Sequence, residues 1–91
     1  MKQSLHIVSR SPFTTTDLTQ ALGFMGDQDA LLLCGEAVQA LRTGLDFQLP
    51  LFTYALLEDV QARAITTEIS CIDYVQMVNL TLEYQRVHTW Q

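Results

Sequence analysis

The sequence is poor in positive charge. Lys2 is its only lysine and four arginines are spread over the rest, against ten acidic residues, so the formal net charge is −5 at pH 7. A protein that binds nucleic acid directly needs clustered lysine and arginine side chains to neutralise the phosphates. The composition therefore argues against DNA or RNA as a direct partner.

Long apolar runs are also absent. The segments 30–33 and 55–57 fall far short of the roughly 18 apolar residues of a membrane-spanning helix. A secretory signal needs roughly 7–15 continuous apolar residues after its basic start, whereas here the first apolar stretch stops at Val8. We therefore expect no membrane partner and a cytoplasmic location.

Cysteine is scarce, with only Cys34 and Cys71 present. Two cysteines cannot build a disulfide framework, and a structural zinc site needs four ligands. His6 and His88 have no carboxylate or cysteine at ligand spacing, so a histidine satisfied by a hydrogen bond is favoured over a metal ligand. We expect no cofactor and a reducing compartment.

Apolar residues, in contrast, are plentiful. They make up 48% of the 91 residues, while only 16% are charged, where about 25% is usual for a soluble domain. The length allows one domain, which we place at 1–91. The low charge indicates that part of the surface meets another protein rather than water.

The hydrophobic period alternates along the chain. The patterns predict strands at 5–9, 30–34, 51–57 and 70–74, with a short fifth strand at 87–90. They predict helices at 14–24, from Gly35 to the breaker Thr43-Gly44, at 58–65, and after the capping residue Asp73, where Val75, Val78 and Leu82 form an apolar stripe. Alternating strands and helices are typical of a parallel sheet covered on both faces. We expect the α/β class, as a small three-layer α/β/α sandwich with a mostly parallel sheet of four or five strands in the doubly wound, flavodoxin-like order.

In such folds, ligands collect at the carboxyl ends of the strands. Six side chains at these ends, or at the end of the chain, are candidates for a site or an interface: Arg10, Ser11, Pro12, Glu36, Asp59 and Trp90. Adjacent residues on a helix do not face each other, so Glu58 and Asp59 are better explained as helix-terminal charges than as an acid/base pair. Trp90 is expected to be buried either in its own chain or against a partner.

Cys34 is the one candidate for a catalytic side chain. It follows a predicted strand and precedes a helix N-terminus, whose dipole would lower the thiol pKa and suit a nucleophile or a persulfide carrier. The alternative is a buried cysteine packed as a small apolar side chain, and the nearby Glu36 would oppose a thiolate. Cys71 lies inside a predicted strand and is expected to be structural. The residues alone yield no convincing catalytic set.

Several strings of the sequence together resemble the TusB/DsrH family of sulfur-relay proteins. They are LHIVSRSPF at 5–13, DALLLCGEAV at 29–38, YALLEDVQARAI at 54–65, IDYVQMVNLT at 72–81, and the tryptophan at position 90. The match runs in order through nearly the whole chain.

This resemblance implies a subunit that is not an enzyme by itself. TusB-like chains assemble with TusC-like and TusD-like paralogues as a heterotrimer that pairs into a hexamer. The assembly passes persulfide sulfur, through a further downstream carrier, toward 2-thiolation of the tRNA wobble uridine. The main sulfur-carrying cysteine belongs to the TusD/DsrE subunit.

Departures from the family pattern refine this interpretation. DsrH-type members carry a cysteine in the first helix region, where this sequence has Gln20 and Ala21, and that difference favours the tRNA-thiolation branch and a non-carrying subunit. Three alternatives stay open: a DsrH-type subunit in dissimilatory sulfur oxidation, a direct persulfide carrier through Cys34, and a homo-oligomeric module that has lost the relay.

Overall fold

The computed structural model describes residues 4–42 and 47–90. The described chain alternates strands and helices, in the order β1 (Ser4–Val8), α1 (Asp17–Phe24), β2 (Ala30–Leu33), η1 (Gly35–Leu41, a 3-10 helix), β3 (Thr53–Leu56), α2 (Leu57–Ala62), β4 (Ser70–Ile72), α3 (Tyr74–Glu83) and β5 (Arg86–Trp90). None of the helices in these two ranges combines the length and the apolar character needed to cross a membrane.

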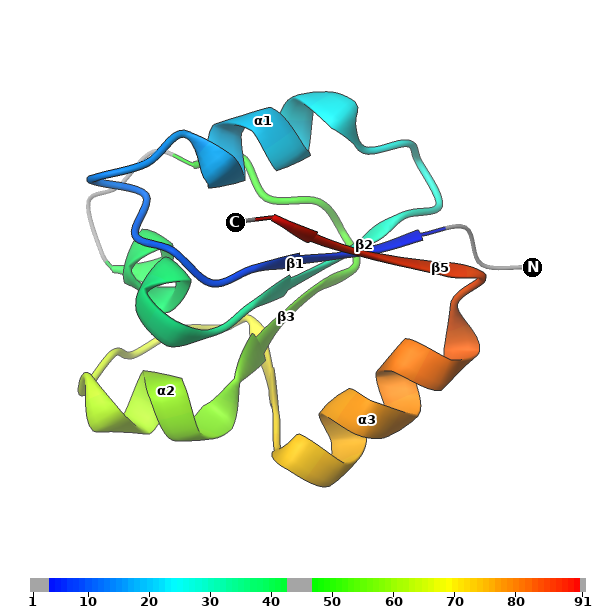
Figure 1. Ribbon diagram of the computed structural model, residues 1–91. Helices are drawn as coiled ribbons and strands as arrows, with labels where there is room; N and C mark the ends of the chain where they lie inside the picture. The colour runs from blue at the N-terminus through cyan, green and yellow to red at the C-terminus, as the bar shows by residue number, and fades with distance from the viewer. Residues whose placement is uncertain (1–3, 43–46, 91) are drawn as a thin grey trace.

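The five strands form one parallel sheet in the order β4-β3-β2-β1-β5. Leu18 of α1, Val38 of η1 and Val60 of α2 share one core cluster, while Leu80 of α3 belongs to a second cluster. Figure 1 shows α1 and α3 on opposite sides of the sheet. Right-handed crossovers explain this division, because the chain steps from β1 to β4 in one direction and returns through α3 to β5. The predicted three-layer α/β/α sandwich is confirmed.

The strand order differs from the flavodoxin order in the neighbours of β1. In flavodoxin the first strand lies between the second and the third, whereas here β1 lies between β2 and β5. Leu5 of β1 is in register with Ala30 on one side and with Val87 on the other. Periodicity predicts that a segment forms a strand, but it does not say which strand lies beside it.

Strand β2 lies at the centre of the core, and all four of its residues are 0% exposed. Leu31 and Leu33 pack into the cluster on the α1 side, and Leu32 packs into the cluster on the α3 side. Each fully buried leucine contributes roughly 1.5–3 kcal/mol of transfer free energy to folding. The predicted strand with two buried faces is therefore confirmed.

Several predicted boundaries were wrong for local reasons. The first helix begins at Asp17 and not at residue 14, because the N–H groups of Thr14 and Thr15 bond the carbonyl of Ser11 in a turn. The third strand is shorter than 51–57, and the predicted strand at 70–74 ends at Ile72. The predicted helix end at 43–44 lies outside the described residues.

Asp73, in contrast, caps α3 as predicted. Its carboxylate accepts the Gln76 N–H at 2.8 Å, and the Gln76 side chain accepts the Asp73 N–H at 2.9 Å. This reciprocal pair is a capping box, which satisfies two amide groups that the helix leaves free.

Candidate functional site

The carboxyl ends of β1, β2 and β3 lie at one edge of the sheet, where the sequence predicted a site. Arg10 forms a two-pronged ion pair with Asp17, with N···O distances of 2.6 and 3.0 Å. Ser11 Oγ accepts the N–H of Phe13 at 3.1 Å, while Pro12 is half-buried in the same turn. These contacts stabilise the connection from β1 to α1.

Glu36 and Asp59 come together beside the N-terminus of η1, joined by Arg63. Arg63 Nη2 lies 2.6 Å from Glu36 Oε2, and Arg63 Nη1 lies 3.6 Å from Asp59 Oδ1. The hydrogen bond from Arg63 is the main cause that lowers the pKa of Glu36. Sequence reasoning missed the contact between Arg63 and Glu36, because the two residues lie 27 positions apart in the chain.

Gly35 fixes the backbone at this edge. Its N–H donates to Asp59 Oδ2 at 2.7 Å, and its φ of 53° lies in the left-handed region that favours glycine. A Cβ at this position would lie 2.9 Å from the carbonyl oxygen of Ser9. The close approach of η1 to the end of β1 therefore requires glycine.

Cys34 is half-buried just ahead of this cluster. Its Sγ lies 3.8 Å from the carbonyl oxygen of Val8. Burial, followed by the negative charge of Asp59, raises the pKa of the Cys34 thiol. This direction is opposite to the lowering that a helix dipole would produce, because desolvation and a nearby carboxylate disfavour the thiolate. Cys71 is half-buried against the core on the α1 side.

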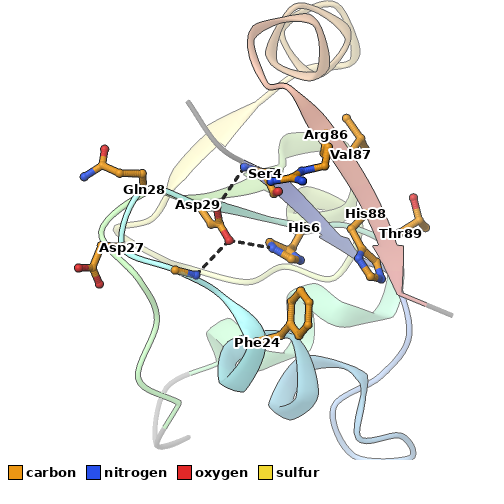
Figure 2. Close-up of a pocket in the computed structure, with 11 residues that line it drawn as sticks. Ser4, His6, Phe24, Asp27, Gln28, Asp29, Arg86, Val87, His88 and Thr89 are labelled. Carbon is orange, nitrogen blue, oxygen red and sulfur yellow. Dashed lines mark hydrogen bonds and ion pairs between the residues drawn. The ribbon is translucent and has the colours of Figure 1, made fainter. Parts of the chain in front are cut away.

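A cavity of about 900 Å³ opens at the opposite, amino-terminal edge of the sheet. Figure 2 shows side chains from β1, the end of α1, the turn before β2, and β5 around it. Its lining includes Ser4, His6, Phe24, Asp29, Arg86 and His88. The sequence did not predict this cavity.

The floor of the cavity is a buried hydrogen-bonded histidine. His6 is 1% exposed; Trp90 Nε1 lies 3.1 Å from its Nδ1, and Asp29 Oδ2 lies 3.2 Å from its Nε2. An indole nitrogen can only donate, so Nδ1 is the acceptor, and Nε2 carries the proton and donates it to Asp29. His6 is therefore satisfied by hydrogen bonds, as predicted. Both ring nitrogens are thus engaged in contacts within the chain.

Asp29 gathers further donors from the backbone. It accepts the N–H of Ser4 and the N–H of Gly26, each at 3.0 Å. Burial pushes the pKa of Asp29 upward, but the bonds from Gly26, His6 and Ser4 outweigh it, so the pKa is lowered. The carboxylate thus ties together the starts of β1 and β2 and the end of α1.

The rings of Phe24 and His88 line the cavity, and Trp90 packs against both of them. Trp90 stacks on His88 with ring centroids 4.5 Å apart and an interplanar angle of 11°. The Phe24 ring meets both of them edge-on at 6.0 Å. Trp90 packs within its own chain and stays partly exposed, and its burial against a partner stays a prediction. In the two described ranges, no three His, Cys, Asp or Glu side chains gather so that they could hold a metal ion.

Comparison with known proteins agrees with the resemblance seen in the sequence. The family model described as DsrH like protein matches residues 10–87. Protein TusB of Escherichia coli strain K12 is 35% identical over 95 aligned positions, which cover 94% of this chain and 99% of that protein. Protein TusB of Shigella boydii serotype 18 matches with the same identity and coverage. The chain belongs to the DsrH-like protein family.

Proposed function

We propose that this single-domain chain is a non-catalytic subunit of a cytoplasmic sulfur-relay complex, which passes persulfide sulfur toward 2-thiolation of the tRNA wobble uridine. Support comes from the similarity to proteins named TusB over nearly the whole chain. The charged groups at the carboxyl ends of the strands agree with a non-catalytic role. Arg10, Glu36 and Asp59 take part in ion pairs or backbone contacts, and the raised pKa of Cys34 disfavours a reactive thiolate.

The observation that carries the proposal is the apolar outer face of α3. Val75, Val78 and Leu82 are 70%, 54% and 78% exposed, although their spacing of three and four residues is that of a buried helix face. The helix packs on the sheet with Leu80 and Met77 instead. An apolar stripe of this kind on a charge-poor chain is typical of a surface that meets another protein.

We infer that the partners are TusC-like and TusD-like paralogues, in a heterotrimer that pairs into a hexamer. The sulfur-carrying cysteine belongs to the TusD-like subunit, which passes the sulfur to a downstream carrier. Co-expression of the three chains from one genome, followed by native mass determination, tests this assembly. Leu82→Asp should abolish co-purification. The matched variant Thr19→Asp, exposed on α1 at the opposite side of the sheet (Figure 1), should leave it unchanged. A free chain in every mixture would overturn the proposal.

A second experiment tests the role in sulfur transfer. Deletion of the gene should lower wobble 2-thiouridine in cellular tRNA, and Cys34→Ala should restore it as well as the natural chain does. Two results together would instead show that this chain is a carrier. A peptide containing Cys34 would gain one sulfur atom from a persulfide donor, and Cys34→Ala would fail to restore 2-thiouridine. Normal 2-thiouridine after deletion would favour the sulfur-oxidation branch or a module outside the relay.

A further inference from the structure

Arg86 is a cationic side chain at the cavity of the amino-terminal edge, and its charge is not used within the chain. The other three arginines each donate to a side chain of the same molecule: Arg10, Arg42 and Arg63. For Arg86, no hydrogen bond or ion pair is found to any residue within 4–42 and 47–90. A guanidinium is a planar fork that binds the paired oxygens of a carboxylate or a phosphate. The cavity therefore offers a site for an anionic group.

Two acidic residues line the same cavity but do not neutralise Arg86. The carboxylate of Asp29 accepts two backbone N–H groups and lies 3.2 Å from His6 Nε2, so its charge is already compensated. Asp27 is exposed, and Figure 2 shows its side chain at the turn before β2, away from Arg86. A ligand with several negative charges would be repelled by these two carboxylates. The charge distribution therefore favours a ligand with a single anionic group.

Phe24 supplies an aromatic surface in the same cavity. It is 67% exposed, yet three edge-on ring contacts hold it in place. Its centroid lies 6.0 Å from the centroids of His6, His88 and Trp90. A ring that is fixed by its neighbours but largely open to solvent can pack against a planar ligand without a large loss of side-chain entropy.

The strand register places the guanidinium and the phenyl ring within the span of one small molecule. Arg86 and His88 are two residues apart on β5 and share a face of the sheet with His6. The rise of a strand separates them by roughly 6–7 Å, and the Phe24 centroid lies 6.0 Å from that of His88. Figure 2 shows Arg86 and Phe24 on either side of His6. The cavity volume of about 900 Å³ is typical of small-molecule sites, which measure roughly 300–1,000 Å³.

We propose that this cavity binds a small monoanion that carries a planar aromatic ring, such as an aromatic carboxylate. The anionic group pairs with the Arg86 guanidinium, and the ring packs against Phe24 above the floor formed by His6. This floor is preformed, because both ring nitrogens of His6 are engaged within the chain, and a preformed site binds at a lower entropic cost. The inference goes beyond the sulfur-relay role and does not rest on it.

Two other classes of ligand fit the cavity less well. A polyphosphate would bring several negative charges against Asp27 and Asp29, in a chain whose net charge is already −5. A neutral apolar ligand would displace water from the Arg86 guanidinium without offering it an acceptor. A ligand with one charged end and one aromatic end satisfies both walls.

Titration of the full, isotope-labelled chain with 2-naphthoate, followed by NMR, tests the proposal. We expect saturable shifts of the amide signals of Phe24, Arg86 and His88, with a Kd of about 1 mM or below. Two matched compounds separate the contributions of charge and ring. The alcohol 2-naphthalenemethanol has the rings without the charge and should bind at least about tenfold more weakly. The saturated analogue decahydro-2-naphthoate has the charge without the aromatic rings and should bind about threefold more weakly or less well still.

Two pairs of matched variants locate the ligand in the cavity. Arg86→Gln should weaken 2-naphthoate binding by at least about tenfold, because the ion pair with the ligand is lost. Arg42→Gln removes the same charge from a residue that does not line the cavity, and it should leave the Kd unchanged. Phe24→Leu should weaken binding by about threefold or more. Phe13→Leu, at a phenylalanine that is 61% exposed outside the cavity, is its control.

The indole N–H signal of Trp90, the only tryptophan, shows that each variant is folded, because this group bonds the buried His6. Three results would overturn the proposal: the absence of saturable shifts, equal affinity for 2-naphthoate and its alcohol, or equal affinity of the two members of either variant pair. The titration uses this chain alone, so its outcome is independent of capture by paralogous subunits.

Discussion

The indole Nε1–H of Trp90 donates to Nδ1 of His6 across 3.1 Å, so that a hydrogen bond joins the last strand to the first over 84 positions of sequence. This bond fixes the His6 tautomer and directs its Nε2–H to Asp29, 3.2 Å away. Three side chains from β1, β5 and the turn before β2 thus form one buried polar chain.

Trp90→Phe should lower the free energy of unfolding by about 1–3 kcal/mol, because it leaves the buried Nδ1 of His6 without its donor. Urea unfolding followed by circular dichroism measures the change. Tyr74→Phe, at an exposed aromatic residue of α3, is the control and should change stability by no more than about 0.5 kcal/mol. Equal stability of the two variants would show that the bond contributes nothing.

The lowered pKa of Asp29 links stability to pH. A carboxyl group whose pKa is lower in the folded than in the unfolded chain stabilises the fold above its unfolded pKa of about 3.9. That contribution is lost as the pH falls from about 4 through the folded pKa. Asp29→Asn should destabilise the protein by roughly 1–3 kcal/mol at pH 7 and flatten this acid dependence. Unfolding curves across the pH range measure both effects, and Asp27→Asn, at an exposed position, is the control. Identical pH profiles for the two variants would contradict a stabilising role of the Asp29 carboxylate.

Gly35→Ala should destabilise the protein by roughly 1–3 kcal/mol, because alanine is strained at a φ of 53° and its Cβ would press on the carbonyl of Ser9. Gly23→Ala is the matched control: it lies within α1 with nothing within 4 Å of a Cβ, and it should stabilise by about 0.5–1 kcal/mol. Thermal unfolding gives the sign of each change, and a stabilising Gly35→Ala would contradict the structure.

The raised pKa of Cys34 predicts a thiol that alkylates slowly at neutral pH. Iodoacetamide should modify Cys34 more slowly in the folded chain than in urea, with peptide mass mapping to separate it from Cys71. Asp59→Asn should increase the rate at Cys34 severalfold, because it removes the neighbouring negative charge. A folded chain whose Cys34 reacts faster than in urea would reverse the assignment.

The sequence predicted those elements whose signals are local. The four apolar residues of β2 and the cap at Asp73 can be read from neighbouring positions, and both predictions were correct. The strand order depended on which strand pairs with β1, and the pKa of Cys34 depended on burial and on Asp59, which lies 25 positions further along. Neither quantity follows from a local pattern.

The cavity at the amino-terminal edge escaped prediction for the same reason. His6 and Asp29 are 23 positions apart and meet only because β1 pairs with β2. The register of β1 on β2 would have indicated the contact between His6 and Asp29. Leu5 pairs with Ala30, which brings Asp29 beside Ser4. The predicted interface role of Trp90 stays a prediction, because it concerns contact with another chain.

The position of β1 between β2 and β5 has a consequence for biosynthesis. During translation β1 emerges well before β5, so one of its sides stays bare until β5 has left the ribosome (Figure 1). A polypeptide that stalls after α3 would therefore present a hydrophobic strand with open backbone groups, which is the kind of surface that promotes aggregation. Synthesis of β5 and burial of the outer side of β1 are thus coupled.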